Sequence, residues 1–185
     1  AREVIQGIRS MLHNRETSQV IVRINDVLRD LLQIVRIDAL ERNVKIKHEI
    51  NSNTHCVRAN RVQLLQVLLN LTLNAFEAMS VSRPDTRCLV ISTDPNSNGE
   101  VVIQVRDNGP GFPAGTADQL FEPFFSTKSE GTGMGLAIAR GIVEAHGGTL
   151  KGENCESGGA CFTVRLPMAK DDGAETPYLV AVGTN

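Results

Sequence analysis

Apolar residues recur with two different periods along the chain, and the two periods separate predicted helices from predicted strands. Spacings of three and four residues predict helices over residues 1–17, 27–40, 60–80 and 133–145. Period-two alternation and short apolar runs predict strands over residues 20–22, 45–50, 56–58, 88–93, 101–107, 149–154 and 160–166. Turn-rich segments between neighbouring strands predict two hairpins, 45–58 and 149–166, and Asn25 or Asp26 is the expected cap of the second helix.

The helix predicted over residues 60–80 is apolar on nearly every side, which predicts a central position in the fold. Asn70, Asn74 and Glu77 are the exception, because spacings of four and three residues place them on one face. A polar stripe that faces solvent would explain them. A pocket would also explain them, since amide and carboxylate oxygens suit Mg²⁺ and its phosphate ligands.

Asp107 ends a strand in which Val101, Ile103 and Val105 alternate with polar residues. The alternation predicts that its carboxylate faces the interior, where it needs hydrogen-bond donors from the backbone or a ligand. A hairpin turn at Asp-Asn-Gly is the alternative, but no pairing strand follows within the next dozen residues. The glycines on both sides of Pro110 would let the backbone pass close to a flat ligand.

Residues 108–133 are predicted to be irregular, and a loop of this length inside a compact domain is usually functional. It ends in three glycines, at positions 131, 133 and 135, that lead into a helix. Free N–H groups at a helix start favour phosphate binding, although the glycines could supply flexibility alone. The chain has neither a strand before these glycines nor a Gly-Lys phosphate loop, which disfavours both common nucleotide folds.

Composition narrows the class of protein. The chain has 185 residues, 41% of them apolar, and a formal net charge of −2. One compact domain fits this length, and the charge lacks the basic footprint expected of a nucleic-acid partner. The four cysteines show no metal-ligand spacing and are expected to be reduced thiols. No uninterrupted apolar run approaches 18 residues, so no membrane contact is expected.

Four segments, taken in order, closely resemble the N, G1, F and G2 boxes of sensor histidine kinases: QVLLNLTLNA (66–75), DNGPGF (107–112), FEPFFSTK (121–128) and GTGMGL (131–136). The resemblance implies an α/β two-layer sandwich, with a mixed, mostly antiparallel sheet backed by three helices (the Bergerat-type ATP-binding fold). It implies a catalytic ATP-binding domain over 18–168 with a lid at about 110–132. Residues 1–17 would end a helical stalk, and 169–185 would form a weakly ordered tail.

The same resemblance implies roles for individual residues. Asn74 would ligate Mg²⁺, Asn70 would lie near the phosphates, and Asp107 would accept a hydrogen bond from the adenine amino group. Asn70 and Lys128 are the candidates for catalysis. The remaining expected ATP contacts are Ala75, Ala78, Gly109, Gly111, Thr127, Gly131, Thr132, Gly133, Met134, Gly135, Leu136 and Phe162.

Two departures from the family pattern bear on the chemistry. Related gyrase, mismatch-repair and heat-shock ATPases carry a glutamate that activates water where this chain has Asn70, so slow hydrolysis is expected. Ala160 stands where many relatives place a threonine beside adenine.

No histidine of this chain fits the context of a phosphoacceptor; the four are His13, His48, His55 and His146. We therefore expect a truncated chain without its own target histidine.

These inferences predict transfer of the γ-phosphoryl group of Mg²⁺-bound ATP to a histidine on a separate stalk segment. The expected partners are that stalk, a response regulator receiver domain and, in the full-length protein, a second copy; the expected location is the cytoplasm. Two alternatives stay open: a nucleotide-gated interaction module without phosphotransfer, and a stand-alone gyrase-like ATPase.

Overall fold

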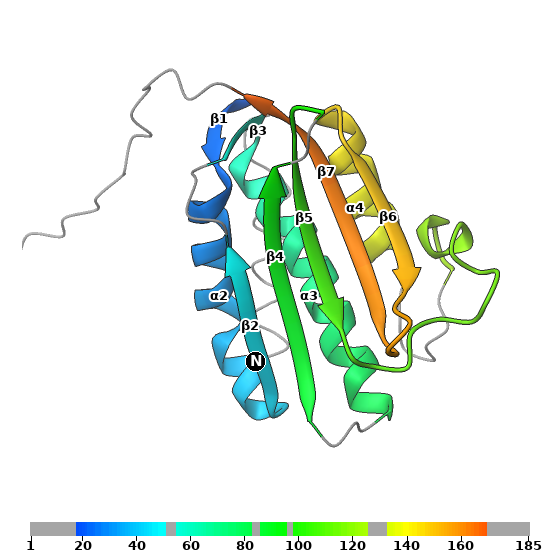
Figure 1. Ribbon diagram of the computed structural model, residues 1–185. Coiled ribbons are helices and arrows are strands. Elements are labelled where there is room, and N and C mark those ends of the chain that lie inside the picture. The colour runs from blue at the N-terminus through cyan, green and yellow to red at the C-terminus, as the bar shows by residue number, and fades with distance from the viewer. Residues whose placement is uncertain (1–17, 51–54, 83–85, 96–97, 126–132, 170–185) are drawn as a thin grey trace, which may run out of the picture.

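The computed structural model describes residues 18–50, 55–82, 86–95, 98–125 and 133–169. These residues form one mixed sheet with helices packed on one of its faces (Figure 1). The strands are β1 (Val20–Arg23), β2 (Val44–Ile50), β3 (Cys56–Ala59), β4 (Arg87–Pro95), β5 (Glu100–Asp107), β6 (Thr149–Asn154) and β7 (Ala160–Ala169). The helices are α2 (Ile24–Glu41), α3 (Arg61–Ser82) and α4 (Gly135–Ala145), with the short 3₁₀ turn η2 (Gln119–Phe121). The expected two-layer sandwich backed by three helices is confirmed.

The strand order is β1-β3-β7-β5-β4-β2, and β6 also pairs with β7. All strand pairs are antiparallel except β2 with β4, which confirms a mixed, mostly antiparallel sheet. The predicted 149–166 hairpin is present as β6 and β7. The predicted 45–58 hairpin is wrong, because β2 joins β4 at one edge while β3 joins β1 and β7 near the other. Parallel pairing depends on contacts between distant segments, which a local turn signal does not contain.

Helix α3 lies at the centre of the hydrophobic core, between α2, α4 and the inner face of the sheet. Its residues 61–81 meet the length and mean hydropathy of a membrane span, although polar residues interrupt the apolar run. Most of that window is buried inside the domain, as expected of a core helix. The largest fully buried side chains include Leu28, Leu31, Leu69, Phe76, Met79, Leu89, Ile91, Ile103 and Leu166.

Helix α2 begins without the side-chain cap that the sequence suggested. Strand β1 leads directly into Ile24, and Arg23 occupies the cap position with no capping hydrogen bond. The N–H group of Ile24 instead donates to the carbonyl oxygen of His55 at 3.0 Å. The prediction of Asn25 or Asp26 as the cap is therefore wrong, since the helix already begins at Ile24 and the carbonyl of His55, the residue before β3, supplies an acceptor that a cap would otherwise provide.

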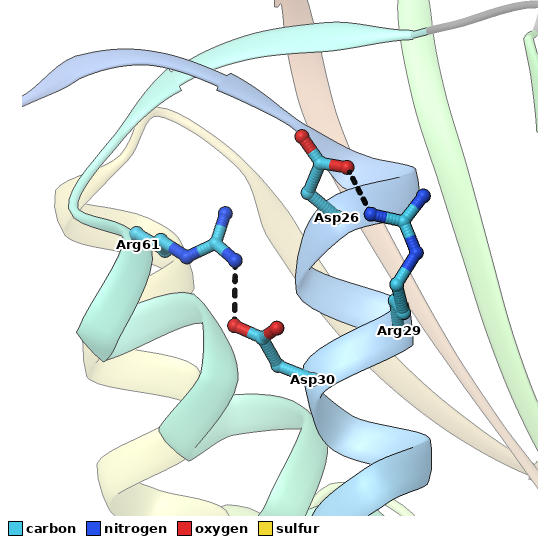
Figure 2. Close-up of polar contacts among 4 residues, drawn as sticks. All are labelled: Asp26, Arg29, Asp30 and Arg61. Atoms are coloured by element: carbon cyan, nitrogen blue, oxygen red, sulfur yellow. Dashed lines mark hydrogen bonds and ion pairs between the residues drawn. The ribbon is translucent and has the colours of Figure 1, made fainter. Parts of the chain in front are cut away.

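Two ion pairs lie at the start of α2, one within that helix and one that connects it to α3 (Figure 2). Asp30 of α2 accepts from Arg61 of α3 at 2.5 Å, and Asp26 accepts from Arg29 at 2.9 Å. The Asp30 and Arg61 side chains are each more than a third exposed. Exposed pairs contribute little to stability, so buried apolar side chains account for most of the packing of α2 against α3.

The start of α3 is fixed by Asn60, as the predicted boundary of that helix requires. Its Oδ1 accepts from the N–H groups of Val62 and Gln63 at 3.0 and 3.1 Å. Its own N–H group donates to Nε2 of His146 at 2.9 Å, and Nδ1 of that ring lies 2.7 Å from the carbonyl of Ile142. Because a carbonyl only accepts, Nδ1 is the donor and the ring is neutral. His146 thus bridges α4 and α3 through both of its ring nitrogens.

We expect Asn60→Ala to lower the free energy of unfolding by about 0.5–2 kcal/mol, because two N–H groups of α3 lose their acceptor. Urea unfolding followed by circular dichroism measures the change. Asn60→Ser is the matched control, since its hydroxyl can still cap the helix. Equal losses in the two variants would show that the cap contributes nothing.

Strand β7 is longer than predicted. It continues past Leu166 through Pro167 to Ala169, where Met168 and Ala169 pair with Val57 and Cys56 of β3. The expected stalk segment (1–17) lies outside the described residues, as do residues 170–185 of the expected tail and residues 126–132 of the expected lid.

Candidate functional site

Asp107 ends β5 on the inner face of the sheet, and its side chain is only 4% exposed. Its Oδ1 accepts from the backbone N–H groups of Gly109 at 2.8 Å and Ala160 at 3.3 Å. The predicted interior orientation is confirmed, and two backbone donors stabilise the carboxylate. They also fix its position, which is what recognition of a ligand group requires.

Gly109 brings this end of the site against helix α3. A methyl group at Gly109 would lie 2.9 Å from Oδ1 of Asp107 and 3.3 Å from backbone atoms of Ala78 and Met79. Only glycine therefore allows the loop after β5 to approach the helix this closely. Ala78 and Asp107, both predicted to contact the nucleotide, are thereby placed next to the same glycine.

Asn70 marks a second position along the same helix. It is 2% exposed, and its Nδ2 donates to the carbonyl oxygen of Gly135 at 3.0 Å. This hydrogen bond joins the middle of α3 to the first residue of α4, where the glycine motif ends. The solvent-facing stripe is thus wrong for Asn70, although Asn74 and Glu77 are partly exposed.

Asn70 and Ala78, two positions of α3 that contact neighbouring segments, define a wall of the candidate site. Eight residues separate Asn70 from Ala78, a distance of roughly 12 Å along the helix axis. Asn74 lies halfway between them and is partly exposed, whereas Ala75 is buried. The arrangement therefore brings the N-box face of α3, Asp107 and the start of α4 to one side of the domain.

The loop after Asp107 is held by two asparagines that the sequence interpretation did not assign. Asn154 of β6 accepts from the N–H group of Phe112 at 2.9 Å and donates to its carbonyl at 2.7 Å. Asn108 similarly accepts from the N–H group of Cys88 and donates to the carbonyl of Thr86. Gly111 lies directly against the Asn154 side chain. Asn108 stands within the DNGPGF motif, but no local signal marks Asn154.

Aromatic rings anchor the described part of the expected lid. Phe162 of β7 is buried, and its ring centroid lies 6.4 Å from those of both Phe112 and Phe121. Phe121 meets it edge-on and carries the Arg140 guanidinium at 5.6 Å from its own centroid. Phe124, in contrast, is 78% exposed. The loop therefore docks on β7 and α4 through Phe121.

We expect Arg140→Ala to lower the free energy of unfolding by about 0.5–1 kcal/mol through loss of the contact between its cation and the Phe121 ring. Arg140 also pairs with Glu144 at 2.7 Å, and both side chains are about half exposed. Glu144→Gln removes only that ion pair and should change the stability less. Thermal unfolding of the two variants compares the effects. A larger loss in Glu144→Gln would contradict the role of the ring contact.

The other predicted nucleotide contacts divide into those that the structure describes and those that lie outside the described residues. Gly133 has a φ of +64° and packs so closely on the backbone of Phe124 that a methyl group would not fit. Met134 precedes α4 and is exposed, whereas Leu136 is partly buried against the core. Thr127, Lys128, Gly131 and Thr132 lie outside the described residues, so their roles stay predictions.

The cysteines near Asp107 carry free thiols. Burial raises the pKa of Cys155, and the negative charge of Asp107 contributes to the rise against the opposing effect of Arg106. Burial likewise raises the pKa of Cys161. Because both values lie above the ordinary thiol pKa of 9.0, both side chains are protonated and weakly nucleophilic at neutral pH.

The protein ligands available for a cation are few. Within the described residues, no group of three or more His, Cys, Asp or Glu side chains could hold a metal ion. A partly exposed amide on the site wall, Asn74, nevertheless fits Mg²⁺, because this ion keeps several waters and binds with substrate phosphates rather than in an all-protein cage. Bound there, Mg²⁺ would offset the negative charge of the phosphates.

Comparison with known proteins gives consistent results. Residues 59–170 match the family described as histidine kinase-, DNA gyrase B- and HSP90-like ATPases. The sensor protein FixL of Bradyrhizobium diazoefficiens is 35% identical over 93% of this chain. The chain spans 34% of the FixL length, about a third.

Solved structures agree with the sequence comparison. The catalytic domain of the histidine kinase ThkA has a TM-score of 0.72 and 30% identity, covering 81% of this chain and 95% of that one. ThkA in complex with the response regulator TrrA gives 0.71 and 26%, covering 91% and 47%. Full-length ShkA in complex with AMPPNP gives 0.73 and 27%, covering 84% and 32%. The chain therefore belongs to the family of histidine kinase-, DNA gyrase B- and HSP90-like ATPases, as an ATP-binding catalytic domain of the sensor histidine kinase type.

Proposed function

We propose that this domain binds Mg²⁺ and ATP and transfers the γ-phosphoryl group to a histidine on a separate stalk segment of a sensor kinase. The placement of Asp107 carries the proposal. A buried carboxylate fixed by the N–H groups of Gly109 and Ala160 is suited to accept a hydrogen bond from an adenine amino group. Ala78, next to it on α3, would pack near the base.

The phosphates would extend along α3 from Asp107 toward the start of α4. In this orientation Asn74 would hold Mg²⁺, and Asn70 would lie near the phosphates. The N–H groups at the start of α4 favour anions, and Lys128 would add a positive charge. ShkA, a relative of similar fold, was solved with the ATP analogue AMPPNP, which supports a nucleotide in this site.

Transfer is favoured over hydrolysis by the chemistry of Asn70. An amide cannot accept a proton as a general base, and the Asn70 side chain already donates to Gly135. A histidine nitrogen from outside the domain would attack the γ-phosphorus, and ADP would leave as that bond forms. The contribution of the domain would be positioning and charge neutralisation. A stand-alone ATPase would need a base at the position of Asn70, where this chain has an amide.

The remaining expectations concern the whole protein. We propose residues 1–17 as the end of the stalk, residues 110–132 as a lid over the nucleotide, and a homodimer in the full-length kinase. A response regulator receiver domain is the proposed acceptor from the histidine, supported by the complex of ThkA with its response regulator. A cytoplasmic location follows from the chemistry, because ATP and response regulators are intracellular.

The test mixes this domain with a dimeric stalk fragment that carries an acceptor histidine, Mg²⁺ and ATP labelled at the γ-phosphate. Acid-labile, alkali-stable label on the stalk supports the kinase. Binding of nucleotide without labelling favours the interaction module, and release of labelled phosphate without stalk favours the ATPase. A stalk with histidine replaced by glutamine is the control for label on other residues.

A further inference from the structure

Glu77 is the one charged residue of α3 beyond its first turn, and the roles proposed above leave it unused. The helix has only two charged residues, Arg61 and Glu77, and Arg61 already pairs with Asp30 of α2 at the opposite end. The last four turns of the helix therefore present a single negative charge. Its position along the helix decides what that charge faces.

Helical geometry places Glu77 on the wall of the candidate site. Asn70 points toward the start of α4, as its hydrogen bond to Gly135 shows. Asn74 and Glu77 follow four and seven residues later, which puts all three side chains within roughly 60° around the helix axis. Asn70 is buried, whereas Asn74 and Glu77 are partly exposed. The side chains on this face are thus buried at Asn70 and become partly accessible to solvent toward Glu77.

A carboxylate on this wall would repel the phosphates that the proposed function places there. The repulsion turns into attraction if a divalent cation lies between the two negative groups. Mg²⁺ prefers oxygen ligands and is commonly bound through one or two carboxylates together with substrate phosphates. Asn74 provides only a neutral amide, and Oδ1 of Asp107 already accepts from two backbone N–H groups.

We propose that Glu77 acts with Asn74 to hold the divalent cation of the bound nucleotide, its carboxylate supplying the negative charge of the protein ligand set. This inference rests on the proposed nucleotide site and adds a residue to it. It predicts opposite effects on two affinities. Without Glu77 the cation binds more weakly, while the metal-free nucleotide binds more tightly because its phosphates are no longer repelled.

The experiment titrates Mn²⁺ into ADP-saturated protein and measures free Mn²⁺ by electron paramagnetic resonance, while calorimetry measures ADP binding in a chelator. For Glu77→Gln we expect about 10-fold weaker Mn²⁺ binding, a change of about 1.4 kcal/mol, and ADP affinity in chelator raised severalfold. Glu77→Asp keeps the charge and should fall between Glu77→Gln and the unmodified chain. Glu49→Gln, an exposed position on β2, should change neither affinity.

Unchanged Mn²⁺ affinity in Glu77→Gln would overturn the inference, as would weaker ADP binding in chelator. Both variants are first compared with the unmodified chain by circular dichroism, and Glu77→Asp provides the second reading if Glu77→Gln unfolds. Failure of the unmodified domain to bind ADP with Mg²⁺ would refute the proposed function. Normal binding with an unchanged metal dependence would refute only the role of Glu77.

Discussion

Replacing Asp107 by asparagine is expected to weaken ADP binding about 10- to 100-fold, while the free energy of unfolding changes little. The fold tolerates the change because an amide Oδ1 can still accept from Gly109 and Ala160. That arrangement leaves the amide nitrogen in the place of the second carboxylate oxygen. A donor would then meet the donor of the adenine amino group, and loss of a hydrogen bond to a charged group costs about 1.5–3 kcal/mol.

Isothermal titration calorimetry with Mg²⁺ present measures this loss. Asp94→Asn is the matched control, because Asp94 is an exposed aspartate on the neighbouring strand β4 and should leave ADP binding unchanged. A comparison of ADP with GDP sharpens the test, since guanine carries an oxygen where adenine carries its amino group. If Asp107→Asn binds ADP as tightly as the unmodified chain does, Asp107 does not contact the base.

Helices α2, α3 and α4 and most of the described strands could be predicted from periodicity because each is specified by its own residues. The inward alternation of β5 and the nearly uniform apolar character of α3 follow directly from burial on one or several sides. The pairing of β2 with β4 could not be predicted, because its register joins Val44 to Arg87 across the whole of α3. Loop closure over such distances is decided by the assembled core rather than by local turns.

The extension of β7 failed to be predicted for a related reason. The predicted strand stops at Leu166, and the next residue, Pro167, cannot donate a ladder hydrogen bond. In the fold, the N–H group of the next residue, Met168, donates to Gly99 at 2.8 Å, and β3 then provides a partner for the strand end. The strand therefore continues past the proline because its neighbours supply the remaining hydrogen bonds.

The residues of the candidate site also differ in whether local sequence patterns could predict them. Residues whose role depends on the face of one element, such as Asn70 and Asp107, could be found from spacing and alternation. Asn154 could not, because its role is to bridge the backbone of Phe112, 42 residues earlier in the chain. Side-chain to backbone bridges of this kind leave no periodic signal, since any asparagine in a turn-rich strand end looks the same in sequence.

Two adjacent glycines in the turn between β6 and β7 allow the support of Asp107 to be tested separately from the conformation of the turn. Gly158 and Gly159 have nearly the same φ, +89° and +87°. A methyl group at Gly158 would meet nothing within 4 Å, whereas at Gly159 it would collide with the carbonyl oxygen of Asp107 and the Cα atom of Asn108. The two positions thus share a left-handed backbone conformation and differ in the space available for a side chain.

We expect Gly158→Ala to lower the free energy of unfolding by about 1–2 kcal/mol, the cost of placing a side chain in the left-handed region. Gly159→Ala should lower it by about 2–5 kcal/mol, because steric overlap adds to the same strain. Urea unfolding measures both values, and calorimetry measures ADP binding. Only Gly159→Ala should also weaken ADP binding, since relief of the overlap must move Asp107 away from Gly109 and Ala160. Equal effects of the two substitutions on stability and binding would show that the close contact at Gly159 does not position the carboxylate.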